Sequence, residues 1–183
     1  MAFELPLALA AVTAQAGTPA TLDQFEAVLA SHDSATRALE QWCAARRIAD
    51  PPVVHAKIVS TAGNDPPAGM RRRLGVGPDD PLGMRNVALS CGGIVLSVAW
   101  NWYVPARLTP AMNEALGRSD TPFGKVAAPL GFRRKAIATI AGPAERCPAA
   151  TISTHLAMLY LPDGEPLAYV VECYTAAILS AGG

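Results

Sequence analysis

The sequence predicts a single-domain α+β fold in which helices pack on an antiparallel sheet of about six strands. The chain has 183 residues, of which 51% are hydrophobic and 16% charged, as expected of one well-buried globule. Helical patterns dominate the start of the chain, and β-rich runs joined by hairpin signals dominate the rest. No linker or low-complexity tract divides it, so we expect one domain spanning residues 1–183.

Two helices are predicted before the first strand. Thr21 and Gln24 have the spacing of a capping box, and apolar residues then recur on one helical face up to residue 29. A second helix begins with Asp33 or Ser34 as its N-cap and ends before Pro51-Pro52. Further along, Thr109 and Pro110 mark the start of a helix over 108–116.

Strands are predicted from β-rich composition and turn signals. Gly92-Gly93 separates two β-rich runs and is a strong signal for a two-residue hairpin. On the first of these strands, Arg85, Val87, Leu89 and Cys91 share one face. The predicted strands cover 53–60, 84–91, 94–104, 135–141, 151–161 and 166–179.

Composition excludes several classes of function. Fifteen basic residues balance fifteen acidic ones, so there is no electrostatic footprint for nucleic acid. The one basic run, at 70–75, is interpreted as a solvated loop or helix face. The four cysteines form no CxxC pair and are expected to be buried thiols, and the three histidines belong to no ligand motif. No metal and no cofactor is implied.

The first residues, MAFELPLALAAVTAQAG, are apolar and contain Ala14-Gln15-Ala16, which is similar to a signal-peptide cleavage site. The basic segment that normally precedes such a site is missing, and Glu4 stands there instead. We therefore expect an N-terminal helix packed on a cytoplasmic protein, with export as the alternative. No segment is long and apolar enough to predict a membrane span.

Glu172 interrupts the apolar run PLAYVVECYTAAIL, and a buried carboxylate requires a partner, a proton or a ligand. Arg85 lies on another strand with an otherwise apolar face. Together they would suit a small ring acid, with the guanidinium binding a carboxylate and the Glu addressing an oxygen opposite. Two alternatives stay open: Arg85 and Glu172 pair only with each other, or Glu172 faces water at an edge. Trp100 and Trp102 are interpreted as core or interface packing.

Four segments, taken in order, resemble the chorismate lyase (chorismate–pyruvate lyase) family over about residues 30 to 179. They are HDSATRALEQ (32–41), MRNVALSCGGIVLSVAWNWYVP (84–105), DTPFG (120–124) and DGEPLAYVVECY (163–174). The resemblance implies a chorismate lyase-like fold and the cofactor-independent elimination of pyruvate from chorismate to give 4-hydroxybenzoate, a ubiquinone precursor.

The resemblance also implies site residues. Arg85 and Glu172 would be the catalytic pair, with Arg85 and the backbone N–H of Phe123 holding the ring carboxylate and Glu172 near the C4 oxygen. Substrate contacts would further come from Ser34, Ala35 and Gly124. A proton transfer from Glu172 to the ether oxygen is a hypothesis.

Departures from the family pattern affect the substrate's second carboxylate, which has no obvious partner. Lys125, Arg133 and Arg134 are the candidates for it, and surface charges are the alternative. The same sheet resembles UTRA ligand-sensing domains of GntR-type regulators, in which an effector binds and no reaction follows. The expected partner is thus a small molecule, bound by a monomer or dimer, and the alternative to a lyase is a binding or sensor domain.

Overall fold

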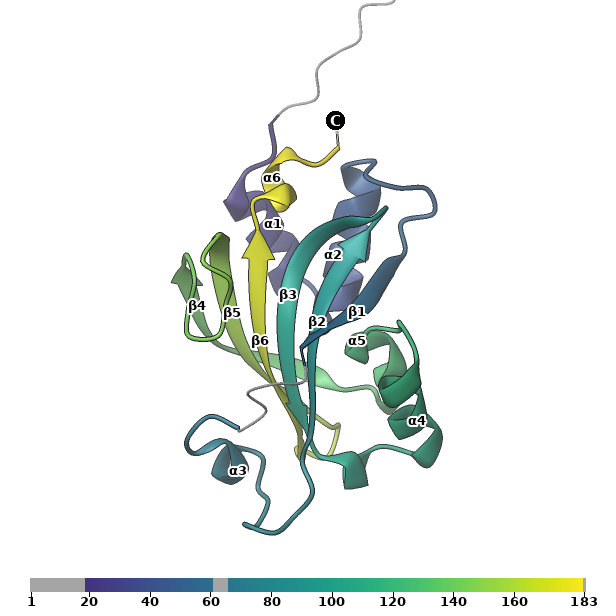
Figure 1. Ribbon diagram of the computed structural model, residues 1–183, viewed down its shortest axis with the longest axis vertical. Coiled ribbons are helices and arrows are strands. Elements are labelled where there is room, and N and C mark those ends of the chain that lie inside the picture. The colour runs from purple at the N-terminus through teal and green to yellow at the C-terminus, as the bar shows by residue number, and fades with distance from the viewer. Residues whose placement is uncertain (1–18, 61–65, 183) are drawn as a thin grey trace, which may run out of the picture.

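The structure, a computed structural model, describes residues 19–60 and 66–182. Six strands form one antiparallel sheet in the order β1-β2-β3-β6-β5-β4 (Figure 1), which confirms the predicted α+β class. The strands are β1 Val54–Ser60, β2 Gly83–Cys91, β3 Ile94–Tyr103, β4 Arg133–Ala141, β5 Thr151–Tyr160 and β6 Pro166–Thr175.

The sheet consists of two three-stranded meanders, β1–β2–β3 and β4–β5–β6, joined where β3 pairs with β6. The predicted Gly92-Gly93 hairpin is confirmed: both glycines have positive φ, 56° and 80°, which a two-residue type I′ turn requires. A bulge between Leu89 and Ser90 then shifts the register of β2 on β3 by one residue.

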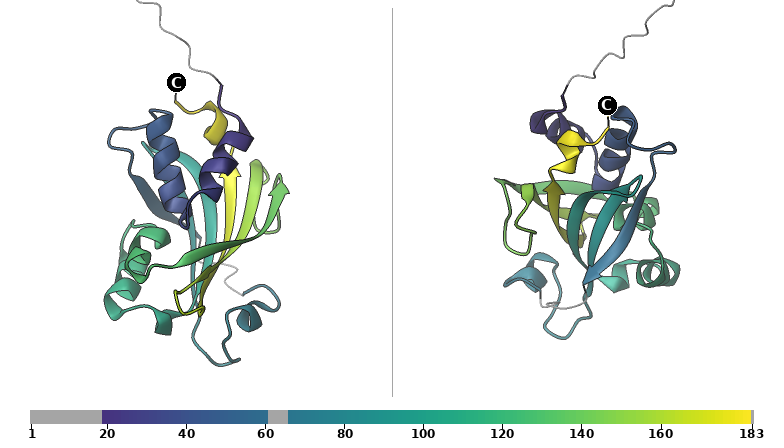
Figure 2. Two further views of the ribbon diagram at one scale, coloured as in Figure 1. Left: turned by 180° about the vertical axis from the view of Figure 1, so that it is seen from behind. Right: turned by 45° about the horizontal axis from the view of Figure 1, so that its top comes forward.

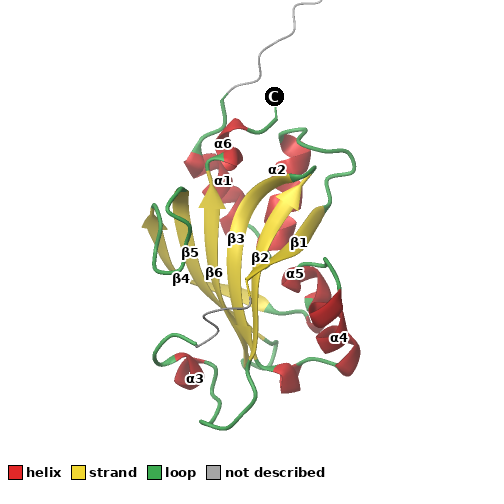
Figure 3. Ribbon diagram, viewed as in Figure 1, coloured by secondary structure: helices red, strands yellow, loops and turns green. Residues whose placement is uncertain are grey.

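Helices lie on both faces of the sheet. Figure 2 shows α1 Leu22–Ala30 and α2 Ala35–Ala45 over one face, and Figure 3 separates helices from strands by colour. Three predicted caps are confirmed, since the side chains of Thr21, Ser34 and Thr109 each accept a backbone N–H. The remaining helical elements are α3 Met70–Arg73, η1 Pro105–Arg107, α4 Pro110–Arg118, α5 Phe123–Val126, η2 Ala128–Leu130 and α6 Ala177–Ser180.

Several local predictions differ from the structure. The run 166–179 ends as a strand at Thr175, and its last residues form α6. The basic run agrees with the predicted helix face in forming α3, where Arg72 and Arg73 are exposed; Arg71 is only partly solvated, because its guanidinium donates to the carbonyls of Gly77 and Asp80 at 2.7 and 2.8 Å. Both are short helices fixed by tertiary contacts rather than by propensity. The helix expected over residues 1–17 lies outside the described residues.

Three apolar clusters fill the space around the sheet. The first joins α1, α2 and α6 to β1–β3 and contains Phe25, whose ring meets that of Trp42 edge-on at 5.4 Å. The second joins α4 and α5 to β5 and β6. The third lies on the opposite face, where Trp100 and Trp102 stack with their ring centroids 5.7 Å apart. Core packing of both tryptophans is thereby confirmed.

The expectation of four free thiols is wrong. Cys43 of α2 is bonded to Cys91 of β2, and Cys147 of the β4–β5 connection is bonded to Cys173 of β6. The bonded cysteines are 48 and 26 residues apart in the sequence, so their spacing does not predict the pairs. Only the packing of α2 on β2, and of the β4–β5 connection on β6, brings each pair together. Among the described residues, no helix has the length and hydropathy needed to cross a membrane.

Candidate functional site

A pocket lies where the two meanders join, at the seam between the first and second apolar clusters. Its volume is about 40 Å³, whereas an apolar cavity of about 150 Å³ accommodates benzene, so a ring ligand requires the walls to move apart. The lining residues are Asp33, Ser34, Ala35, Thr36, Leu89, Ala99, Asn101, Pro122, Phe123, Gly124, Phe132, Leu159, Val170 and Glu172.

Glu172 is the one acid on the sheet wall of this pocket, and its partner is Arg134. The side chains of both are only 6% exposed, and the Arg134 Nη2 lies 2.7 Å from the Glu172 Oε2. The predicted alternatives, pairing with Arg85 and exposure at an edge, are both wrong. β5 separates β6 from β4, and the long Arg134 side chain on β4 reaches across it to Glu172.

The hydroxyl of Tyr174 completes this ion pair by donating to the Glu172 Oε2 at 3.2 Å. Tyr174 is fully buried, and burial, followed by the nearby Glu172 carboxylate, raises the pKa of its phenol well above the usual value. Burial is the largest influence on the pKa of Arg134 and lowers it, but the Glu172 charge, Tyr174 and the hydrogen bond to Glu172 together outweigh it, so the net shift of that pKa is upward. The geometry therefore holds Arg134 as a cation and Tyr174 as a neutral donor.

We predict a distinct alkaline loss of stability that depends on Tyr174. Above pH 10 the tyrosine of the unfolded chain ionises while the buried one keeps its proton, so the unfolded state binds fewer protons and stability falls as pH rises. The wild type should lose up to about 1.4 kcal/mol of unfolding free energy per pH unit more than Tyr174→Phe. Urea unfolding at pH 8, 10 and 11 measures this, and equal slopes for both proteins would refute it.

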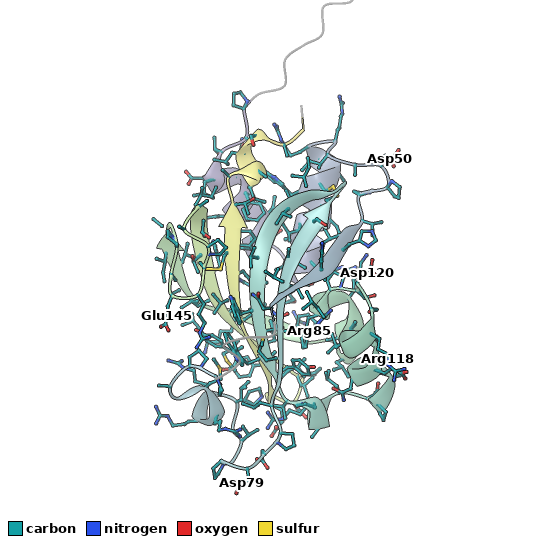
Figure 4. All side chains as sticks on the ribbon, viewed as in Figure 1. Asp50, Asp79, Arg85, Arg118, Asp120 and Glu145 are labelled. Carbon is teal, nitrogen blue, oxygen red and sulfur yellow. A yellow bond between two sulfur atoms is a disulfide. The ribbon has the colours of Figure 1, made fainter. Side chains whose placement is uncertain are left out.

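Arg85 lies on the same face of the sheet as Glu172 but does not contact it. The register aligns Arg85 with Asn101 and Ala99 with Glu172, so two strand spacings of about 4.8 Å separate the two backbones. Arg85 is 5% exposed and therefore buried, and Figure 4 labels it among the side chains of the sheet. Its guanidinium donates to the carbonyls of Thr121 and Ser119 at 3.0 and 3.3 Å.

The charge of Arg85 is buried without a carboxylate, because no acid among the described residues lies within salt-bridge distance. Its Nε is buried and has no hydrogen-bond acceptor among those residues. Burial lowers the pKa of Arg85, and Tyr103 opposes that shift. An unpaired, largely dehydrated cation next to the pocket favours an anionic ligand.

Asn101 is a pocket residue that the sequence analysis missed. It is 6% exposed, lines the pocket from β3, and makes no side-chain hydrogen bond with any residue in the described ranges. It also lies directly opposite Arg85 in the sheet. A buried amide without a protein partner is costly, so this side chain is available to a ligand.

Residues 119–124, which we call the lid, close the pocket. The two hydrogen bonds from the Arg85 guanidinium attach the lid to β2. A third hydrogen bond attaches it to β1, since the backbone N–H of Ala56 donates to the Asp120 carbonyl at 2.6 Å. At its other end, Gly124 packs on the start of α2: a Cβ there would lie 2.4 Å from the Ser34 Oγ. Only glycine allows the lid to approach α2 this closely.

We predict that Gly124→Ala lowers the free energy of unfolding by about 1–3 kcal/mol, because the new methyl displaces the Ser34 hydroxyl and the lid. Gly117→Ala is the matched control, since a Cβ at Gly117 in α4 meets nothing within 4 Å. The control should be neutral or up to about 1 kcal/mol more stable. Chemical denaturation compares the two, and an equally tolerated Gly124→Ala would contradict the close contact.

The other residues suggested by the family resemblance divide into two groups. Ser34, Ala35, Phe123 and Gly124 line the pocket together with Glu172. Lys125 does not line it and pairs with Glu40 at 2.6 Å. Arg133 is 79% exposed and lies 3.4 Å from Asp33.

A second cleft of about 400 Å³ lies between α1 and the β4–β5 edge; it shares Asp33 with the pocket and is also lined by Arg134, the partner of Glu172. His155, on β5, contributes to it, and its Nε2 lies 3.2 Å from both the Glu26 Oε1 and the Ser153 Oγ. Arg134, which also lines this cleft, pairs with Glu172 through its Nη2, while its Nε is buried and has no acceptor among the described residues. The cleft is therefore a polar neighbour of the pocket.

Comparison with known proteins identifies a relative and a fold. The uncharacterized protein y4mC of Sinorhizobium fredii is 38% identical over 182 residues, covering 87% of this chain and 76% of that protein. A scan against protein-family models finds no matching family.

Solved structures with the same fold include regulators. The effector domain of PhnF from Mycobacterium smegmatis superposes with a TM-score of 0.56 at 16% identity, covering 79% of this chain and 89% of that one. Whole PhnF gives 0.56 at 15% identity, with 83% and 66% covered, and the possible transcriptional regulator YydK from Bacillus subtilis gives 0.50 at 16%, with 68% and 60% covered. The chain thus spans under two thirds of YydK and about two thirds of PhnF.

At these identities the likeness establishes the fold alone, which is the UTRA-like fold of effector domains. The UTRA-like resemblance found in the sequence is thereby confirmed at the level of fold. None of these named proteins is described as a chorismate lyase.

Proposed function

The chain belongs to the family of the uncharacterized protein y4mC of Sinorhizobium fredii, and from its pocket we propose that it is a binding domain for a small aromatic carboxylic acid. The observation that carries this proposal is the position of Arg85, a buried cation without a carboxylate partner in the described structure, directly opposite Asn101, which lines the apolar pocket. Arg85 itself does not line the pocket but lies next to a residue that does.

The walls define where the ring would lie. Phe123, Phe132 and Val170 present apolar surface to the pocket, and Phe123 is itself supported by the ring of Tyr103 at 5.4 Å. Apolar walls with a few convergent polar groups are the usual composition of a small-molecule site. The ring would occupy the seam, after the lid moves outward.

Polar groups would hold the two ends of the ligand. The ligand's carboxylate would accept hydrogen bonds from the Asn101 side-chain amide. It would also approach the Arg85 guanidinium and partly replace the Thr121 and Ser119 carbonyls, which accept its hydrogen bonds in the structure. At the other end, the Glu172 carboxylate would accept a hydrogen bond from a ring hydroxyl. Arg134 already compensates the charge of Glu172, so this end favours a neutral donor over a second anion.

Chorismate lyase activity is the second candidate. In its favour, Ser34, Ala35, Phe123, Gly124 and Glu172, which the family resemblance assigns to the site, line one pocket, whereas Arg85, Lys125 and Arg134 do not line it. Against the hypothesis of proton donation, Glu172 is held by a guanidinium at 2.7 Å and a phenol at 3.2 Å. That environment suits a carboxylate that accepts hydrogen bonds rather than one that protonates an ether.

Calorimetric titration with 4-hydroxybenzoate and with chorismate, combined with a coupled assay for pyruvate, separates the two candidates. A binding domain should bind at least one of these acids at a single saturable site and release no pyruvate from chorismate. Catalytic release of pyruvate would establish the lyase instead. Folded protein that binds neither acid would refute both.

Asn101→Leu tests the pocket directly. Losing the amide should weaken binding of 4-hydroxybenzoate by roughly 10-fold or more, as expected for one hydrogen bond to a charged group. Asn86→Leu is the matched control, because Asn86 is a buried amide on the opposite face of the neighbouring strand. Equal loss in both variants, or none in Asn101→Leu, would contradict the assignment.

A further inference from the structure

All four cysteines of the chain take part in two cystines, and none is free. The bonded Cα atoms are 6.4 Å apart for Cys43 and Cys91 and 5.6 Å apart for Cys147 and Cys173. Both separations lie within the range of native disulfides. Two independent pairs, each formed from residues distant in sequence, are a pattern of proteins that fold under oxidising conditions.

The first cystine braces the helical wall of the pocket. Cys43 lies on α2, whose first residues carry Ser34, Ala35 and Thr36 to the pocket, and Cys91 ends β2, which contributes Leu89. Both cysteines are fully buried. This bond therefore fixes α2 onto β2 beside the site.

The second cystine braces the sheet wall. Cys173 directly follows Glu172 on β6 and is fully buried, while Cys147 belongs to the β4–β5 connection and is half-buried. The same connection contacts β5 through Thr154, whose hydroxyl accepts the Ala144 N–H at 3.1 Å. The bond thus ties the connection to the strand that carries the pocket's acid.

We infer that the chain functions in an oxidising compartment, where oxidation of its four cysteines fixes both walls of the pocket. Each cystine forms when two thiols lose two protons and two electrons to a disulfide-exchanging oxidant, so the chain gives up four of each in all. The structure thereby favours export, the alternative that the sequence analysis left open for the apolar segment containing Ala14-Gln15-Ala16. The consequence for binding rests on the proposed function.

The test begins with the full chain directed to the bacterial periplasm. Maleimide labelling under denaturing conditions should find no free thiol, and non-reducing peptide mapping should find Cys43 linked to Cys91 and Cys147 linked to Cys173. Folded exported protein with four free thiols, or with other pairings, would overturn the inference.

The second part compares oxidised protein with protein reduced in denaturant and refolded in reductant, with thiol counting to confirm its state. Reduction should lower the melting temperature by roughly 10–20 °C, as two lost disulfides in a chain of this size imply. An unchanged melting temperature, with four thiols counted, would contradict a role for the bonds in fixing the fold.

Binding of 4-hydroxybenzoate to the oxidised and reduced forms provides the third readout, with at least a 10-fold loss expected on reduction. The double variants Cys43→Ser/Cys91→Ser and Cys147→Ser/Cys173→Ser assign the loss to one wall or the other. If oxidised protein binds no acid, the proposed function fails while thiol count and melting temperature still decide this inference.

Discussion

Replacing Arg134 by methionine is expected to lower the free energy of unfolding by about 3–5 kcal/mol, because it leaves the Glu172 carboxylate buried without its cation. The side chains of both are 6% exposed, so water does not replace the lost partner. The remaining hydrogen bond from Tyr174 does not neutralise the charge. Urea denaturation at pH 7 measures the change.

Two further variants make this prediction specific. Arg133→Met removes the neighbouring arginine, which is 79% exposed and lies 3.4 Å from Asp33, and should change stability by less than about 0.5 kcal/mol. The double variant Arg134→Met/Glu172→Leu removes both charges and should recover most of the loss. If Arg133→Met costs as much as Arg134→Met, the buried pair is not what stabilises this wall.

Arg85→Met should behave in the opposite way, with a small effect on stability and a large one on binding. The substitution loses two hydrogen bonds to the lid but also removes a buried cation that has no carboxylate in the described structure, so the unfolding free energy should change by less than about 2 kcal/mol. Affinity for 4-hydroxybenzoate should fall roughly 100-fold, as expected when a charged partner is lost.

Arg85→Lys is the control for the prediction on Arg85. Lysine keeps the charge but cannot hold two lid carbonyls with one planar group, so its affinity for the acid should lie between those of the wild type and Arg85→Met. Titrations of the three proteins under identical salt conditions provide the comparison. Wild-type affinity in Arg85→Met would show that Arg85 serves only to fasten the lid.

Local signals in the sequence predict much of the fold. The capping box at Thr21, the N-cap at Ser34 and the Gly92-Gly93 hairpin depend on residues within a few positions of one another, and all three are present. The alternation that places Val170, Glu172 and Tyr174 on one face also holds, as does its extension to Arg85 on β2. Alternation gives the face of a residue but not the order of the strands.

The order of the strands in the sheet explains why the partner of Glu172 is Arg134 rather than the predicted Arg85. Nothing local shows that β6 lies between β3 and β5, so Arg85 and Arg134 were both possible partners for Glu172. Arg85 is favoured from the sequence because it lies on a strand with an otherwise apolar face. The structure instead places Arg134 within reach, on the far side of β5.

A bulge explains why Asn101 was missed. A regular two-residue hairpin that pairs Cys91 with Ile94 would align Arg85 with Trp100 and turn Asn101 to the other face. The bulge at Leu89 and Ser90 shifts this register by one and aligns Arg85 with Asn101 instead. The disulfides were beyond prediction for a related reason, since four cysteines allow three pairings and spacing does not choose among them.

The central claim is that a buried cation and a buried amide prepare this pocket for a ring carboxylate. Calorimetric titration of the oxidised wild-type protein with 4-hydroxybenzoate and with its neutral amide, 4-hydroxybenzamide, tests it most directly. We predict one saturable site that binds the acid roughly 10- to 100-fold more tightly than the amide. Equal affinity for both, or binding of the amide alone, would contradict the account.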